Sequence, residues 1–160
     1  ESKRFAESLI INYFPNYLIF RVSLLFGPGA RLDDERFLNE IIINSIKNKS
    51  IIAKNKSNQV RSNLFVDDAL NLIFISTVLS SNEILNLSGN SETTIHKMLN
   101  LISNITNKKI QYLDKNDYSA PKNIKIKNSK IKRICNYYKF NSLRNGIEKT
   151  MKWYENLLLI

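Results

Sequence analysis

Residues 17–29 read YLIFRVSLLFGPG, and this stretch decides the fold class. Its first nine residues are apolar apart from Arg21 and Ser23, which predicts one strand over residues 17–25, buried in a parallel sheet. The glycines and proline of residues 27–29 then predict a loop. A buried parallel strand of this kind needs helices on its faces, so helices are expected before and after it in the chain.

Helices and strands alternate along the rest of the chain. The spacing of apolar residues predicts helices over residues 1–14, 35–47, 67–80, 93–105, 129–135 and 142–158. Strands are predicted over residues 51–53, 60–65, 83–87 and 110–113. This alternation indicates an α/β fold.

Three local expectations follow from the residues around these helices. Asp67 or Asp68 is expected to cap the helix that follows, and Ser91 or Thr93 the next one. The helix after Asp68 is apolar on most sides, so we expect it to be deeply packed.

The composition narrows the class of protein. Lys and Arg number 24 against 14 Asp and Glu, a formal charge of +10, and the densest basic run contains Lys122, Lys125, Lys127, Lys130, Lys132 and Arg133. Such a surplus attracts nucleic acid, an anionic membrane surface or a diphosphate metabolite, or it forms a solvated lysine-rich surface. The single Cys135 suits a reducing compartment, and we expect a cytoplasmic protein.

Several segments, taken together and in order, resemble one family. Residues 1–7 (ESKRFAE) resemble the helix that carries a YxxxK motif, with Lys3 as its lysine. Residues 21–29 resemble R-x-x-N-x-Y-G-P, and residues 61–69 (RSNLFVDDA) resemble R-x-F-x-Y-V-x-D. Matching pieces follow at residues 86–89, 129–133 and 143–154. By this resemblance the chain is identified as a member of the NAD-dependent epimerase/dehydratase family, the extended short-chain dehydrogenases/reductases, nearest to UDP-glucuronate decarboxylases and nucleotide-sugar epimerases.

The resemblance implies a fold and a division of the chain. Residues 1–30 would end a Rossmann-like domain, and residues 31–160 would mainly form a small α/β substrate-binding lobe. A strand and helix near residues 66–88 would return to the Rossmann-like domain. The motif tyrosine would lie two residues before Glu1, so we expect a fragment that lacks its N-terminal part, exposes an apolar sheet edge and is inactive alone.

The same resemblance implies an activity. Relatives oxidise a sugar at C4 with NAD, and epimerisation, elimination or decarboxylation follows. The expected cofactor is NAD, with NADP possible, and the expected substrate is a nucleotide-diphosphate sugar. A homodimer is expected for the full-length protein. A reductase of 4-keto-sugar nucleotides that uses NADPH is the first alternative. A basic nucleic-acid-binding module is the second, although no motif of that class is present.

Candidate site residues follow from the motifs. A lysine ammonium one helical turn from a phenol lowers the pKa of that phenol, which suits Lys3 to catalysis. By resemblance Lys3 would also bind the nicotinamide ribose, and Ser23 would contact the cofactor. The alternative for Lys3 is an ordinary solvated lysine.

Arg61 is the strongest substrate-binding candidate. A guanidinium stays charged and donates paired hydrogen bonds to phosphate, and by resemblance Arg61 would contact the diphosphate. Its alternative is an ion pair with an acid such as Asp68. Arg31 and Arg36 can reach a phosphate or carboxylate, and Lys125 or Lys127 can replace a second family arginine that is not evident here. Leu24 stands where many relatives have asparagine.

Other residues are expected to have no direct role in the site. We expect Asp68 to be structural and His96 and Cys135 to bind no metal. We expect Trp153 and Tyr154 to pack against other residues.

Overall fold

The computed structural model describes residues 1–54, 56–90, 92–113 and 123–158. Strand β1 (Leu18–Val22) pairs in parallel with β5 (Glu83–Leu87), and strand β2 (Leu24–Phe26) pairs in parallel with β4 (Val60–Phe65). The predicted parallel pairing is therefore confirmed, but residues 17–25 contribute to two strands rather than the single strand that was predicted. The chain exchanges one neighbour for another at Ser23, and this exchange interrupts the ladder.

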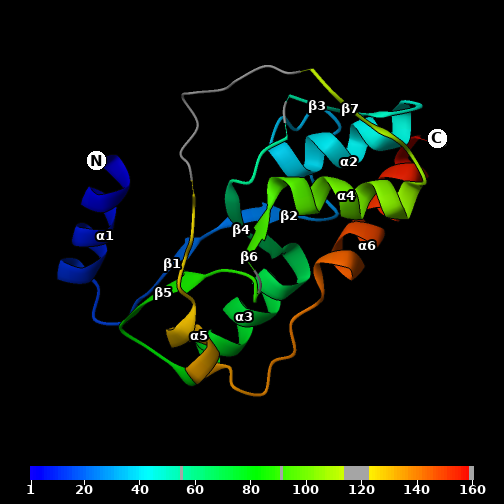
Figure 1. Ribbon diagram of the computed structural model, residues 1–160. Helices are drawn as coiled ribbons and strands as arrows, with labels where there is room; N and C mark the ends of the chain where they lie inside the picture. The colour runs from blue at the N-terminus through cyan, green and yellow to red at the C-terminus, as the bar shows by residue number, and fades with distance from the viewer. Residues whose placement is uncertain (55, 91, 114–122, 159–160) are drawn as a thin grey trace.

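Two further pairings complete the sheets. Strand β6 (Glu92–Thr94) runs antiparallel to β4, and the short strands β3 (Ile51–Ala53) and β7 (Ile110–Tyr112) pair in parallel. A parallel bridge joins Arg61 to Ile124, so residues near 124 also lie beside β4. Strand β4 therefore stands between several segments that are distant in the sequence (Figure 1).

All the predicted helices are present, close to their predicted bounds. They are α1 (Ser2–Tyr13), α2 (Phe37–Lys47), α3 (Val66–Leu79), α4 (Ile95–Thr106), α5 (Ser129–Ile134) and α6 (Leu143–Leu158). The side chain of Thr94 caps α4 by accepting a hydrogen bond from the Lys97 amide at 3.2 Å, so the prediction of Thr93 was wrong, and Ser91 lies outside the described residues. Helix α3, by contrast, has no side-chain cap among the described residues, so the prediction of Asp67 or Asp68 as its cap was wrong.

The buried apolar side chains form two clusters. One lies among α2, α4, α6 and the strands β3 and β4, and the other among α3, α5, β1, β4 and β5. Strand β4 belongs to both, because Leu64 is buried in the second cluster and Phe65 in the first. Successive side chains of a strand point to opposite faces, so one short strand holds the two cores together.

The expectation that α3 is deeply packed was wrong. Leu72 and Ala69 are buried, but Leu70, Phe74 and Val78 are 62%, 73% and 72% exposed. These three residues recur every fourth position and therefore form one apolar strip along the helix. The sequence pattern showed an apolar helix but not which of its faces the described chain covers.

Helix α1 is also uncovered. None of its residues is buried, and Phe5 and Tyr13 are 66% and 77% exposed. Figure 1 shows α1 beyond strand β1, apart from α2, α4 and α6. In the described residues no helix is long and apolar enough to cross a lipid bilayer.

Gly89 allows the end of β5 to approach β4. Its amide donates a hydrogen bond to the Asn63 carbonyl oxygen at 3.1 Å. A Cβ atom on Gly89 would lie 2.1 Å from that same oxygen, which no side chain can tolerate. The glycine of the segment 86–89 therefore has a clear steric reason, because only a residue without a side chain fits so close to Asn63 of β4.

Candidate functional site

Arg61 is a buried cation at the start of β4. It is only 8% exposed, and its Nη1 and Nη2 atoms donate hydrogen bonds to the Val60 carbonyl oxygen at 2.9 Å and to Gln59 Oε1 at 2.7 Å. Among the described residues it forms no salt bridge, and burial lowers its pKa. A buried guanidinium without a carboxylate is costly, and such groups concentrate at binding sites.

Asp68 does not neutralise Arg61. Its carboxylate, 2% exposed, accepts hydrogen bonds from the Tyr138 hydroxyl at 2.6 Å and from the Asn141 side chain at 2.6 Å. The Asn141 amide donates to it as well. Asp68 thus joins the start of α3 to the chain before α6, in agreement with the structural role expected for it. The sequence did not reveal its two partners, which lie about 70 residues away.

Arg61 lines a cavity of about 290 Å³ between α2, α4 and strand β3. One part of its lining is apolar: Phe37, Ile41, Ile52, Ala53, Ile95 and Leu99. The other part is polar: Glu35, Glu40, Lys54, Ser57, Gln59 and Arg61. An apolar surface beside a few convergent polar groups is the usual form of a small-molecule site.

Most of the polar lining was missed in the sequence. Gln59 lies two positions before Arg61, so the alternation of a strand could have placed both side chains on one face. Glu35, Glu40 and Ser57 come from other segments of the chain, and no spacing in the sequence connects them with Arg61. Only the packing of α2 against β3 and β4 brings them together.

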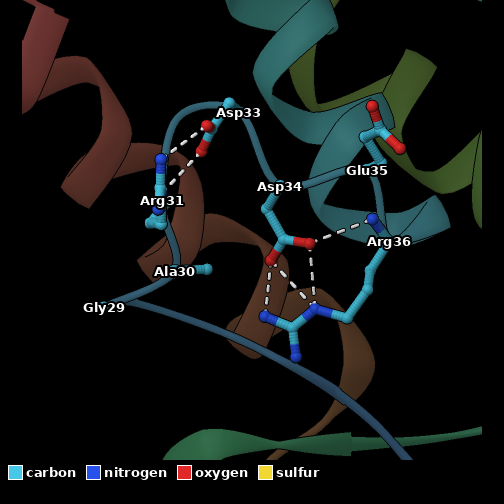
Figure 2. A pocket seen from close by; sticks show the side chains of 7 residues that line it. All are labelled: Gly29, Ala30, Arg31, Asp33, Asp34, Glu35 and Arg36. Atoms are coloured by element: carbon cyan, nitrogen blue, oxygen red, sulfur yellow. Dashed lines mark hydrogen bonds and ion pairs between the residues drawn. The ribbon is translucent and has the colours of Figure 1, made fainter.

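The loop that carries Arg31 and Arg36 borders a second, open hollow of about 800 Å³ (Figure 2). Arg31 is paired with Asp33, and Arg36 with Asp34, through two hydrogen-bonded nitrogens each. The hydrogen bonds from Arg36 hold the pKa of Asp34 well below its usual range. Both arginines are therefore already paired within the loop, and a ligand anion would have to compete with these carboxylates.

Glu35 connects the two hollows, because it lines both. Figure 2 shows its side chain directed away from the pair formed by Arg36 and Asp34. The structure thus brings the loop close to the Arg61 cavity through Glu35, rather than through the two predicted arginines.

Lys125 lies beside β4 but is already paired. Its Nζ atom is 2.8 Å from Glu92 Oε2, and its neighbour Ile124 exchanges backbone hydrogen bonds with β4. Among the described cations, Lys54 lines the cavity together with Arg61. A substrate-binding role beside Arg61 was predicted for Lys125. Lys54, which lines the same cavity as Arg61, fits that role better by its position. Lys130 of the same basic run pairs with Glu83, and Lys122 lies outside the described residues.

Ser23 lies where β1 gives way to β2. It is 9% exposed, and its amide donates to the Leu87 carbonyl oxygen at 2.8 Å. The register pairs Val22 with Leu87, which makes Ser23 and Ser88 the next neighbours. Both hydroxyl oxygens are buried, and among the described residues neither has a hydrogen-bond partner. Buried polar groups are nearly always paired, so these two hydroxyls are exceptions within the described chain.

Lys3 lies on α1 and is exposed to solvent. The described residues do not bring it together with Arg61.

His96 and Cys135 are surrounded by other residues of the fold. His96 Nδ1 lies 3.2 Å from the Tyr112 hydroxyl. The Cys135 thiol is buried, and this burial raises its pKa. The Trp153 and Tyr154 rings pack 4.9 Å apart, as predicted for them. Within the described residues, no group of three or more His, Cys, Asp or Glu side chains is placed to hold a metal ion.

Known proteins share this sequence pattern and this fold. Residues 1–88 match the profile of the NAD dependent epimerase/dehydratase family. The chain is 22% identical over 152 residues to UDP-glucuronic acid decarboxylase 3 of Arabidopsis thaliana, covering 92% of this chain and 44% of that protein.

Two solved structures show the same architecture. UDP-glucose 4-epimerase of Thermotoga maritima, solved with UDP-glucose, has a TM-score of 0.80 at 16% identity, over 98% of this chain and 52% of that one. UDP-glucuronic acid 4-epimerase of Bacillus cereus, solved with UDP-glucuronic acid and NAD, has a TM-score of 0.79 at 19% identity, over 97% and 50%. The predicted Rossmann-like α/β fold class is confirmed, and the chain spans about half the length of these relatives.

Proposed function

We propose, because the chain belongs to the NAD dependent epimerase/dehydratase family, that it forms the substrate-binding part of an enzyme that acts on nucleotide-diphosphate sugars with NAD. The observation that carries this proposal is the buried guanidinium of Arg61, which lines a cavity and has no carboxylate partner among the described residues. The prediction of a diphosphate contact for Arg61 is retained as part of the proposal.

Arg61 has the hydrogen-bonding capacity that a diphosphate requires. A guanidinium carries five N–H donors, and the contacts with Val60 and Gln59 occupy two of the nitrogens. The remaining donors can bind phosphate oxygens in a paired arrangement. Gln59 holds the guanidinium in place, so little side-chain freedom is lost when an anion binds.

The rest of the cavity fits the nucleoside. Its apolar wall, which includes Phe37 and Ile52, suits the flat face of a base. Glu35 and Glu40 can accept hydrogen bonds from ribose hydroxyls, while Lys54 adds positive charge for the diphosphate. We therefore place the nucleotide in this cavity and the sugar toward the loop of residues 29–36.

The two unpaired hydroxyls of Ser23 and Ser88 fit a cofactor amide or hydroxyl at the end of β1 and β5. Parallel α/β sheets bind dinucleotides at the carboxyl ends of their strands. A cofactor held there would supply the hydride acceptor for oxidation of the sugar. Lys3 would hold the cofactor ribose, and its ammonium would stabilise the phenolate of a tyrosine that precedes this chain.

The chain covers about half the length of its relatives, and this supports an arrangement of the full-length protein in two parts. We propose that residues 1–30 complete a Rossmann-like domain and that residues 31–160 mainly form the substrate lobe. The exposed faces of α1 and α3 would then be covered in the full-length protein, which we expect to be a homodimer.

A reductase that uses NADPH would share the same nucleotide cavity. Two cations of the basic run, Lys125 and Lys130, are paired with Glu92 and Glu83.

The test is turnover by the full-length protein. It is incubated with NAD and a panel of UDP-, GDP-, CDP- and dTDP-sugars, and products are followed by mass and chromatography. We expect Lys3→Ala to lose turnover and Arg61→Ala to raise the apparent KM. Arg144→Ala is the control, because Arg144 is an exposed arginine that pairs with Glu148 on α6. Absence of turnover and of NAD binding, with salt-sensitive DNA binding instead, would overturn the proposal.

A further inference from the structure

Helix α1 is held to the described chain through one side-chain pair. The helix buries no residue, and its other side-chain hydrogen bonds, from Ser8 and Asn12, stay within the helix. Among the described residues, the side-chain hydrogen bonds from α1 to another element are those between Glu7 and Arg21 of β1. The position of α1 on the sheet therefore depends strongly on this pair.

The geometry of the pair restrains both distance and rotation. Arg21 Nε lies 2.9 Å from Glu7 Oε1, and Arg21 Nη2 lies 2.5 Å from Glu7 Oε2. Two parallel hydrogen bonds between a planar fork and a carboxylate fix the direction of approach as well as the separation. The Arg21 guanidinium holds the pKa of Glu7 below its usual range, and Arg4 on the same helix adds to this effect. The pair is therefore ionised at neutral pH.

The two residues of the pair are close in the sequence to two candidate cofactor residues. Lys3 is four positions before Glu7, so both side chains leave the same face of α1, about 6 Å apart along the helix axis. Ser23 is two positions after Arg21, directly after the last residue of β1. The Ser23 amide still bonds to Leu87, so the strand geometry persists to that point.

We propose that Glu7 and Arg21 are positioning residues that set the place of Lys3 relative to Ser23. This inference rests on the proposed function, because it assumes that Lys3 acts in catalysis. Neither Glu7 nor Arg21 touches substrate in this scheme. Their carboxylate and guanidinium fix the rotation of α1, and through it the site of the Lys3 ammonium.

A misplaced lysine has measurable consequences. Removal of the Glu7 charge by Glu7→Gln should lower kcat of the full-length enzyme by about 10- to 100-fold, the cost of a misplacement near 1 Å. The KM for the nucleotide sugar should change little, because Arg61 lies on another element. A more distant ammonium stabilises a phenolate less, so the acid limb of the pH profile of kcat should move to higher pH.

The experiment compares Glu7→Gln, Arg21→Gln and the exchanged double variant Glu7→Arg, Arg21→Glu. Glu148→Gln is the matched control, because it breaks an exposed ion pair on α6. We expect both single variants to lose kcat and shift the pH profile, and the exchange to recover part of both. Hydrogen exchange of the α1 amides should rise in the single variants and fall again in the exchange.

Two outcomes would overturn the inference. One is a kcat and pH profile of Glu7→Gln that equal those of Glu148→Gln. The other is a loss of kcat that the exchanged pair does not recover and that occurs without any shift of the pH profile. Lys3→Ala separates this failure from that of the proposed function. If Lys3→Ala stays active, the catalytic role of Lys3 fails, and if it is inactive while Glu7→Gln is normal, the positioning role alone fails.

Discussion

Replacement of Arg61 by methionine should weaken ligand binding while it stabilises the unliganded protein. Methionine has a similar length and no charge, so it keeps much of the apolar packing and removes the buried cation. The two lost hydrogen bonds, to Val60 and Gln59, cost about 1 kcal/mol each in stability. Relief of the buried, unpaired charge returns several kcal/mol, roughly 3–4. The net expectation is a more stable protein, by about 1–2 kcal/mol.

The effect on binding has the opposite sign. A paired contact between a guanidinium and a diphosphate contains at least two charge-assisted hydrogen bonds, each worth about 1.5 kcal/mol or more. Loss of both raises the dissociation constant by roughly 100-fold. Arg61→Lys keeps the charge but not the fork, so we expect intermediate binding and no gain in stability.

Both quantities can be measured on the same preparations of full-length protein. Calorimetric titration with UDP gives the dissociation constant, and thermal unfolding without ligand gives the sign of the stability change. Arg144→Met serves as control for the substitution itself. A melting midpoint below that of wild type, together with unchanged UDP affinity, would refute the reasoning and leave Arg61 as a structural hydrogen-bond donor to Gln59 and Val60.

Three further predictions concern stability. Asp68→Asn should lower the free energy of unfolding by about 2–3 kcal/mol, because a buried charged acceptor is lost. The control Asp67→Asn breaks only an exposed pair with Lys149 and should lower it by about 0.5 kcal/mol or less. Both free energies are measured by urea titration. Gly89→Ala should cost about 3 kcal/mol or more, since its Cβ would meet the Asn63 oxygen, and a wild-type melting curve would contradict the observed approach of β5 to β4. Burial, together with the hydrogen bond to Asp68, raises the pKa of Tyr138 to about 12. The neutral phenol therefore stabilises the fold fully below pH 10, and this contribution is lost as pH rises toward 12. The wild-type protein should lose stability over this range more steeply than Tyr138→Phe, and equal slopes would argue against a buried phenol.

The sequence predicted the helices well because their signals are local. Apolar residues at helical spacing define α2 and α6 without knowledge of their neighbours. The strand over residues 17–25 failed at Ser23 for the opposite reason. Its interruption depends on β4 and β5, which both lie later in the sequence and pair with different parts of this segment.

The candidate site was predicted only in part. Arg61 could be selected because its motif and its chemistry agree, and the structure adds that it is buried without a carboxylate. The pairing of Arg31 with Asp33 and of Arg36 with Asp34 is local, and the short spacing in the sequence could have suggested it. Glu40 could not be foreseen, because it faces the cavity only when α2 packs beside β3. The exposed strip of α3 was hidden for a related reason, since an apolar helix does not reveal which partner covers each face.

The membership of β4 in both cores has a consequence for unfolding. Leu64 and Phe65 are consecutive residues with almost no exposed surface, yet each is embedded in a different cluster. Loss of order in one cluster frees the strand and removes a central side chain from the other. The two clusters should therefore melt in a single cooperative transition. A nucleotide held by Arg61, three residues before Leu64, would raise the melting temperature of both clusters together.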